Sequence, residues 1–304
     1  MSELHSYTRA LTPQQIFRLK ADLPGLGFEP TEVPYTQFAV VKGKLRVSIY
    51  TSGKLLVQGK GLRDFVEFYL EPNVLGEARL GYEHIHDPSI LQPRIGVDES
   101  GKGDFFGPLV VAGAYVNESI VRAWQEADAG IRDSKLVTTD ARIAKLARTI
   151  RETKGCVFDV VAIGPRAYND LHAKMGSVNK ILAWGHARII ENMLAKVDCP
   201  KAISDQFGDK SLIVRALMKR GKQIELVQRH KAESDLAVAA ASILARDEFV
   251  QRLKKLGDEV GIPLPKGASA AVEEAGRTLV AKHGVGKLRD VAKVHFRTTE
   301  KVRK

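Results

Sequence analysis

The segment that begins at Arg94 alternates short apolar runs with longer stretches of helical periodicity. Leu109 to Val116 is a continuous apolar run, and Cys156 to Ile163 is a second one. Ile181 to Lys196 and Leu236 to Leu256 have apolar residues at helical spacing. Strands separated by helices are typical of an α/β sheet with helices packed on it. The pattern predicts an α/β domain over residues 94–304, whose last part is helical and basic.

Residues 1–80 predict a separate, small α+β domain. Thr12 to Ala21 is expected to form a helix, with Thr12 as its cap and Pro13 in its first turn. Apolar residues alternate from Gln37 to Val57 around glycine-containing turns, which indicates a hairpin or meander. The segment 81–93 contains prolines and a glycine and is expected to be a linker.

The chain is basic, with a formal net charge of +11 over 304 residues. An excess of this size makes a polyanion the first partner to consider. Lys42, Lys44 and Arg46 are spaced by two, so on one strand they would share a face that could lie on a phosphate backbone. The alternative is an ordinary solvated sheet face whose lysines discourage aggregation.

Several classes of protein are not expected. No stretch approaches ~18 consecutive apolar residues, and the first residues do not resemble a secretory signal. Cys156 and Cys199 do not form a CxxC pair, so a cytoplasmic protein in a reducing compartment is expected. The eight histidines are dispersed along the sequence and predict no imidazole metal site.

The strongest local signal is a pair of adjacent carboxylates, Asp98 and Glu99, at the end of an apolar strand. Neighbouring carboxylates repel unless a cation lies between them, and hard divalent ions prefer such oxygen ligands. Gly101 and Gly103 allow a close approach of the backbone to a ligand. A P-loop is the rival interpretation, but Gly103 stands where its Ser or Thr is required, and the acids would repel phosphate.

Two further acidic positions follow in the same domain. Asp205 ends the short apolar run Ala202 to Ser204, and Glu233 and Asp235 stand before the helix that starts at Leu236. Acids at a helix start can be caps, and each position alone is a weak signal. Three acidic positions in one α/β domain are nevertheless what a two-metal phosphoryl-transfer site requires.

The segment Asp98-Glu99-Ser100-Gly101-Lys102-Gly103-Asp104, followed by Phe106-Gly107-Pro108, resembles the signature of the type 2 ribonucleases H. Its form is similar to that of bacterial ribonuclease HIII. Other segments agree in order, and they are Asp133-Ser134-Lys135, Asp205-Gln206-Phe207, Lys231-Ala232-Glu233-Ser234, Leu264-Pro265-Lys266-Gly267 and Lys293-Val294-His295-Phe296. The resemblance covers residues 94 to 296.

The resemblance implies a ribonuclease H-like mixed sheet flanked by helices and an endonuclease that cuts the RNA strand of RNA–DNA hybrids. The implied catalytic acids are Asp98, Glu99, Asp205 and Glu233, of which the first three are metal ligands. The spacing after Glu233 is about one residue shorter than in relatives, so Asp235 is the alternative fourth acid. Two Mg²⁺ or Mn²⁺ ions would serve the reaction and give 5′-phosphate and 3′-hydroxyl products.

The resemblance also implies which residues contact the substrate. In the catalytic domain these are Ser100, Gly101, Lys102, Gly103, Ser134 and Lys135, with the Gly101–Gly103 backbone placed to recognise the 2′-hydroxyl that distinguishes RNA. The N-terminal domain would be similar to TATA-binding protein and would bind the hybrid, and Lys42, Lys44 and Arg46 are its candidate contacts.

Two alternatives remain open from the sequence. A ribonuclease HII-like enzyme would incise at single ribonucleotides embedded in DNA. A basic nucleic-acid-binding protein on the same scaffold would have no catalysis, although the intact acids argue against it. We expect a monomer, and no membrane partner.

Overall fold

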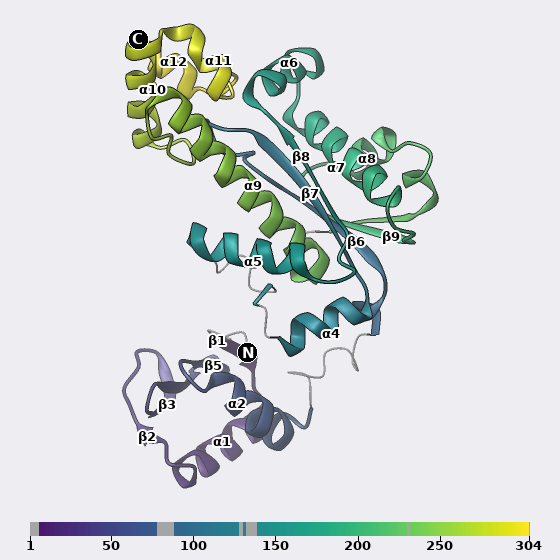
Figure 1. Ribbon diagram of the computed structural model, residues 1–304. Coiled ribbons are helices and arrows are strands. Elements are labelled where there is room, and N and C mark those ends of the chain that lie inside the picture. The colour runs from purple at the N-terminus through teal and green to yellow at the C-terminus, as the bar shows by residue number, and fades with distance from the viewer. Residues whose placement is uncertain (1–5, 78–87, 128–129, 132–138, 230–231, 304) are drawn as a thin grey trace. The chain divides into compact units, whose positions relative to one another are not determined.

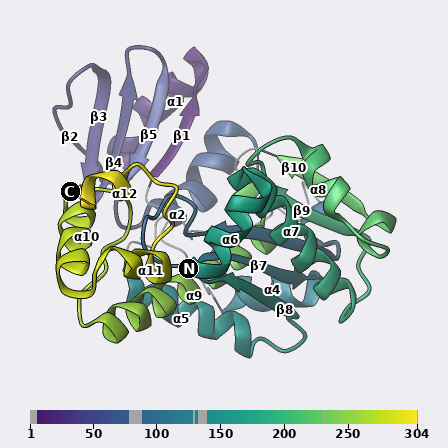
Figure 2. The ribbon, with the colours of Figure 1, turned by 90° about the horizontal axis from the view of Figure 1, so that it is seen from above.

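The computed structural model describes residues 6–77, 88–127, 130–131, 139–229 and 232–303. The chain divides into two compact units, Met1–Ile90 and Leu91–Lys304, which are described separately (Figure 1). The first unit contains a five-stranded sheet in which all paired neighbours are antiparallel. Its strands lie in the order β1 (Ser6–Ala10), β5 (Lys54–Gln58), β4 (Leu45–Tyr50), β3 (Thr36–Lys42) and β2 (Glu29–Pro30), as Figure 2 shows.

One face of this sheet is covered by helices. Helix α1 (Pro13–Gly25) begins with a capping box, in which Thr12 and Gln15 each accept a hydrogen bond from the other's backbone N–H. Helix α2 (Leu62–Phe65) continues directly into a π-helix, η1 (Val66–Leu75). Leucines and valines from these helices and from the strands form one buried cluster. The predicted capped helix and α+β class are confirmed, while β1 and β2 were not expected.

The prediction that Lys42, Lys44 and Arg46 share one strand face is wrong. Gly43 adopts a positive φ of 59° and, with Lys44, makes the turn between β3 and β4. Lys42 pairs with the buried Leu45, whereas Arg46 pairs with Val41 and Gln58 on the opposite face. A spacing of two gives a common face only within one uninterrupted strand.

The second unit contains a mixed five-stranded sheet. Its order is β10 (Glu225–Arg229), β9 (Lys201–Asp205), β6 (Arg94–Ser100), β7 (Leu109–Val116) and β8 (Phe158–Ile163). The pairs β6–β7 and β7–β8 are antiparallel, and the pairs β6–β9 and β9–β10 are parallel. The mixed sheet flanked by helices confirms the predicted fold class.

Helices cover both faces of this sheet (Figure 1). Helix α9 (Leu236–Val260) lies on one face with α5 (Asp140–Glu152) packed on it, and α7 (Val178–Leu194) lies on the other. Helices α6 (Pro165–Met175) and α8 (Lys210–Ala216) pack on α7. The remaining elements are α4 (Glu118–Glu126), α10 (Ala270–His283), α11 (Leu288–Val291), α12 (Thr298–Val302) and the 3-10 turns η2 (Pro88–Leu91), η4 (Gly221–Gln223), η5 (Ala232–Ser234) and η6 (Val285–Lys287).

The central strand β6 lies very close to α9. A Cβ added at Gly96 would stand 2.1 Å from the backbone carbon of Ala237, so only glycine permits this approach. Since side chains alternate along a strand, Asp98 faces the same side as Gly96, and Glu99 faces the side of α7. Helices α4 and α6 were not predicted. Among the described residues, no helix is long and apolar enough to cross a membrane.

Candidate active site

The two adjacent acids lie within β6 rather than in the turn that follows it. The strand continues to Ser100, so Asp98 and Glu99 point to opposite faces of the sheet. Asp98 meets α9, where the Ser242 hydroxyl hydrogen-bonds to it, and Glu99 meets His186 on α7. The parallel strand β9 pairs Ser204 with Val97, which places the last residue of β9, Asp205, beside Asp98.

Asp98 has the most perturbed carboxyl group of the site. Its pKa is raised from 3.8 to about 7, first by burial and then by the charge of Glu99, with a further contribution from Asp205. The hydrogen bond from Ser242 acts in the opposite direction. Burial and the neighbouring carboxylates together therefore favour the protonated form of Asp98 near neutral pH.

Glu99 is held in its ionised form. Burial raises its pKa, but the hydrogen bond and charge of His186, together with the charge of Lys102, lower it below the ordinary value. The two carboxylate oxygens have different neighbours, because Oε2 lies 3.0 Å from His186 Nε2 and Oε1 lies 3.8 Å from Lys102 Nζ. Lys102 is 42% exposed and also lies over the Phe207 ring, so it can reach a bound anion.

Asp205 connects β9 with the 3-10 turn η5. Its Oδ1 accepts a hydrogen bond from the backbone N–H of Ala232 at 3.0 Å. This turn includes Glu233, whose side chain lies outside the described part of the structure. The contact fixes the backbone just before Glu233 next to the carboxylates of β6 and β9.

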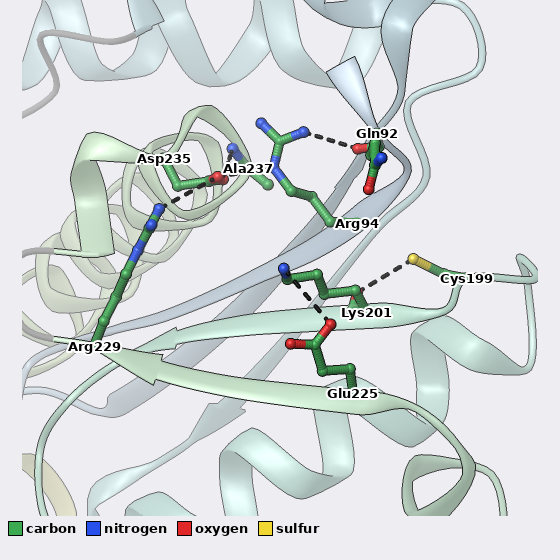
Figure 3. A network of polar contacts seen from close by, with 8 residues as sticks. All are labelled: Gln92, Arg94, Cys199, Lys201, Glu225, Arg229, Asp235 and Ala237. Atoms are coloured by element: carbon green, nitrogen blue, oxygen red, sulfur yellow. Dashed lines mark hydrogen bonds and ion pairs between the residues drawn. The ribbon is translucent and has the colours of Figure 1, made fainter. Parts of the chain in front are cut away.

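Asp235, the alternative fourth acid, has both oxygens engaged elsewhere (Figure 3). Oδ1 accepts from the backbone N–H of Ala237 and caps α9, while Oδ2 lies 2.8 Å from Arg94 Nε. Arg229 approaches the same oxygen at 3.5 Å. Arg94 and Asp235 are both buried, so their ion pair is part of the structural core of this unit.

The Gly101–Gly103 turn is held by the loop that follows it. Gly101 has a φ of 90°, and a Cβ there would stand 2.3 Å from the Pro108 carbonyl oxygen. The fully buried Lys293 donates from Nζ to the carbonyl oxygens of Asp104 and Gly107, both at 2.9 Å. The backbone N–H of Gly267 donates to Asp104 Oδ1. The loop is thus fixed from two distant parts of the chain.

Not all predicted site residues are brought together in the described structure. Ser134 and Lys135 lie outside the described residues. Lys42 Nζ donates to the carbonyl oxygen of Leu26 at 2.7 Å, and Arg46 donates to Gln58. Lys44 lies in the turn between β3 and β4.

The donors present suit a hard divalent cation. Carboxylate oxygens are the ligands that Mg²⁺ and Mn²⁺ prefer, and the raised pKa of Asp98 reports negative charge that a cation would relieve. In the described part of the chain, no three His, Cys, Asp or Glu side chains are grouped closely enough to hold a metal ion. Asp98, Glu99 and Asp205 nonetheless have the ligand chemistry that such an ion prefers, and the turn at Glu233 adjoins them.

Sequence reasoning missed the residues that hold these acids. His186 and Ser204 contact each other and flank Glu99 and Asp205, although the histidines are dispersed in the sequence. Lys293 was noted only as part of a motif. Its position directly after a buried apolar pair, Val291 and Ala292, could have suggested a buried lysine.

Comparisons with known proteins agree over both units. A family model described as Ribonuclease HII matches residues 95–299, and one described as a domain of unknown function (DUF3378) matches residues 9–77. The chain is 42% identical over 302 residues to a ribonuclease HIII from Protochlamydia amoebophila, covering 99% of this chain and 98% of that protein. A ribonuclease HIII from Chlamydia felis is 42% identical, with 93% of each chain covered.

The fold is also similar to a solved structure. The crystal structure of Bst-RNase HIII in complex with Mn²⁺ superposes with a TM-score of 0.67 at 30% sequence identity. The match covers 98% of this chain and 97% of that chain.

Proposed function

This chain belongs to the ribonuclease HIII family, and we propose that Asp98, Glu99, Asp205 and Glu233 are the acids with which it cuts the RNA strand of RNA–DNA hybrids. The observation that carries this assignment is the gathering of carboxylates at the ends of β6 and β9. Burial, with the charges of Glu99 and Asp205 added to it, raises the pKa of Asp98 to about 7, and a divalent cation at this place would offset that negative charge. The enzyme is metal-dependent, and one structural relative contains Mn²⁺.

Glu233 rather than Asp235 is the fourth acid in this proposal. Both oxygens of Asp235 are occupied, by the N-terminus of α9 and by Arg94, and a ligand role would break a buried ion pair. Asp205, in contrast, already holds the turn that contains Glu233 through the Ala232 N–H. In this proposal the 3-10 turn before α9 accommodates the shorter sequence spacing.

A matched pair of variants tests the assignment of the fourth acid. Glu233→Gln and Asp235→Asn each remove one charge and keep a similar shape. We expect the first to abolish metal-dependent cleavage of a long RNA–DNA hybrid while the fold remains stable. The second is expected to cleave when assayed well below its melting temperature. Full activity of Glu233→Gln, or inactive but folded Asp235→Asn, would refute the assignment.

Each side chain has a distinct task in hydrolysis. Two bound ions would supply charge neutralisation at the scissile phosphate, an activated water and stabilisation of the departing 3′ oxygen. Asp98 has both Glu99 and Asp205 as neighbours and would hold the ions together with them. Lys102, partly exposed beside Glu99, can bind a neighbouring phosphate. The products would have 5′-phosphate and 3′-hydroxyl ends.

The backbone of the Gly101–Gly103 turn is proposed to recognise the 2′-hydroxyl group of the RNA strand. Its backbone has no side chains at Gly101 and Gly103 to keep a ribose away, and Lys293 and Gly267 hold the following loop in place. Ser100 ends the strand that leads into this turn, and Ser134 and Lys135 remain proposed substrate contacts. A fixed hydrogen-bonding backbone can distinguish RNA from DNA at one position of the strand.

The N-terminal unit is the proposed substrate-binding domain. Arg46 and Lys54 alternate along their strands with residues of the buried cluster that packs against the helices. They and their strand partners, Gln58 and Ala10, therefore lie on the face of the sheet that the helices leave uncovered. Lys44 lies in the turn between β3 and β4. Lys42 donates a hydrogen bond to the Leu26 carbonyl oxygen on the side of the sheet that the helices cover. This domain's likeness to TATA-binding protein is part of the same proposal.

The salt dependence of binding tests this surface. Contacts to phosphates release counterions, so each lost contact reduces the slope of log K against log salt concentration by about 1. We expect Arg46→Ala with Lys54→Ala to weaken hybrid binding and reduce the slope. Lys42→Ala is the matched control and is expected to change the slope little. Equal effects of both variants would contradict the choice of face.

A second candidate activity is incision at single ribonucleotides embedded in DNA. The match of residues 95–299 to the Ribonuclease HII family model favours it. Cleavage rates on a long hybrid and on a duplex with one ribonucleotide separate the two activities. We expect the long hybrid to be cut faster, and the reverse order would favour the second activity.

We also propose that the enzyme acts as a cytoplasmic monomer. Cys156 and Cys199 are buried free thiols, which suits a reducing compartment. Light scattering of the purified protein would give the mass of one chain, 33.4 kDa, and a dimer mass would contradict this proposal.

A further inference from the structure

His186 is a fully buried imidazole that connects the two strands carrying the acids. Its Nε2 lies 3.0 Å from Glu99 Oε2 on β6, and its Nδ1 lies 3.0 Å from Ser204 Oγ on β9. The Ser204 hydroxyl in turn donates to the carbonyl oxygen of Asp205 at 2.9 Å. One ring therefore links the side chain of Glu99 with the strand end that contains Asp205.

The fold brings His186 to this position through a close helix–sheet contact. A Cβ added at Gly185 would stand 2.8 Å from Val111 Cγ2, so the glycine lets α7 approach β7 closely. The next residue, His186, then reaches β6 and β9 on the same face of the sheet. The Phe207 ring packs against the imidazole with 4.7 Å between ring centroids.

The contacts of Glu99 are divided between its two oxygens. Oε2 is held by His186, while Oε1 is directed toward the exposed Lys102 at 3.8 Å. When one oxygen of a carboxylate is held by a hydrogen bond, the second oxygen also keeps a fixed direction. The side chain is then already in one rotamer before a cation binds, so binding does not include the entropic cost of fixing it. A buried imidazole with both nitrogens paired is also rigid, because breaking either bond would leave a polar atom unsatisfied.

We propose that His186 is a positioning residue of the metal site: it holds Glu99 Oε2 so that Oε1 faces a divalent cation, and it ties Glu99 to the Asp205 strand end through Ser204. This role rests on the proposed assignment of Glu99 as a metal ligand. Hydrogen-bond partners of ligating side chains typically change metal affinity 10- to 100-fold when they are removed. His186 would contact neither substrate nor ion.

Two amide variants separate the two contacts of the ring. The amide of Gln can take the place of Nε2 and donate to Glu99, whereas the shorter Asn can replace only Nδ1, which faces Ser204. Both variants lose the imidazole's packing against Phe207, so they are matched in that respect. The full-length protein is titrated with Mn²⁺ by calorimetry without substrate, and melting temperatures are measured in parallel.

We expect His186→Asn to weaken Mn²⁺ binding about 10- to 100-fold and His186→Gln to restore most of the affinity. The Mn²⁺ concentration for half-maximal cleavage should shift by a similar factor, with kcat recovering at saturating Mn²⁺. A purely structural role would lower the melting temperatures of both variants and leave the affinity unchanged. That result would overturn the proposal. If His186→Asn does not fold, His186→Leu takes its place, because it removes both contacts of the ring and keeps apolar volume beside Phe207. Unchanged Mn²⁺ affinity in that variant also contradicts the proposal.

Glu99→Gln distinguishes a failure of this inference from a failure of the proposed function. If Glu99→Gln binds Mn²⁺ as tightly as the wild type, then Glu99 is no ligand and the assignment of the acids is wrong. If Glu99→Gln loses affinity while His186→Asn keeps it, only the positioning role of His186 is wrong.

Discussion

Replacing Asp98 by Asn should stabilise the metal-free protein while removing its activity. Asp98 lies half-buried beside Glu99 and Asp205, and its pKa is about 7 in the folded protein against an ordinary value of 3.8. The folded state therefore retains a proton that the unfolded chain releases between about pH 4 and pH 7. Across this range the contribution of Asp98 to the free energy of unfolding falls, and it stays low at higher pH.

The size of the effect follows from the same pKa difference. At 1.36 kcal/mol per pKa unit, the loss of stability above pH 7 is about 4 kcal/mol. Because Asp98 is only half-buried, solvent screening reduces this contribution, and we take roughly half of that value as the lower limit. Asn carries no charge, so Asp98→Asn should gain about 2 to 4 kcal/mol at pH 8. For a unit of this size, this corresponds to a rise in melting temperature of roughly 5 to 15 °C.

Thermal melts in the presence of a chelator at pH 4 and pH 8 test this reasoning. The wild type and Asp98→Asn should melt at similar temperatures at pH 4, and the variant should melt higher at pH 8. Addition of Mn²⁺ should raise the melting temperature of the wild type at pH 8 much more than that of the variant. An Asp98→Asn protein that melts at or below the wild-type temperature at pH 8 would refute the proposed crowding of carboxylates.

Three further substitutions test how the fold supports the site. Asp235→Asn breaks the buried ion pair with Arg94 and should cost about 3 to 5 kcal/mol in a denaturant titration; an unchanged midpoint would contradict a stabilising role of this pair. Lys293→Met keeps the apolar stem but leaves two loop carbonyl groups unpaired, which should cost roughly 1 to 3 kcal/mol and raise KM for hybrid; unchanged KM would argue against a role for the loop in binding. Gly96→Ala forces α9 away from β6, so poor folding is expected, and a wild-type melting temperature would show that the close approach is not required.

The sequence predicted best what local patterns determine. Leu109 to Val116 was identified as a strand with the observed bounds, because a continuous apolar run between turn residues suits a strand buried on both faces. The helix after Thr12 was identified from its cap, and the structure contains the complete capping box. The acids Asp98, Glu99 and Asp205 were placed together because strand ends meet at one edge of a sheet.

Contacts between distant residues could not be predicted in the same way. His186 and Glu99 are 87 positions apart, and nothing in the local pattern around His186 distinguishes a partner of a carboxylate from a core histidine. The choice between Glu233 and Asp235 depends on a 3-10 turn and on a buried arginine 141 positions away. Lys42 and Arg46 were misplaced because one glycine turn between them reverses the chain.

The central claim is that Asp98, Glu99 and Asp205 hold divalent cations. Anomalous diffraction from a crystal of this protein grown with Mn²⁺ tests it most directly, because the signal locates the ion independently of activity. We predict an anomalous peak at the ends of β6 and β9, within ligand distance of Asp98 and of at least one other of these carboxylates. Ordered carboxylates with no peak between them, or Mn²⁺ bound only elsewhere, would contradict the account.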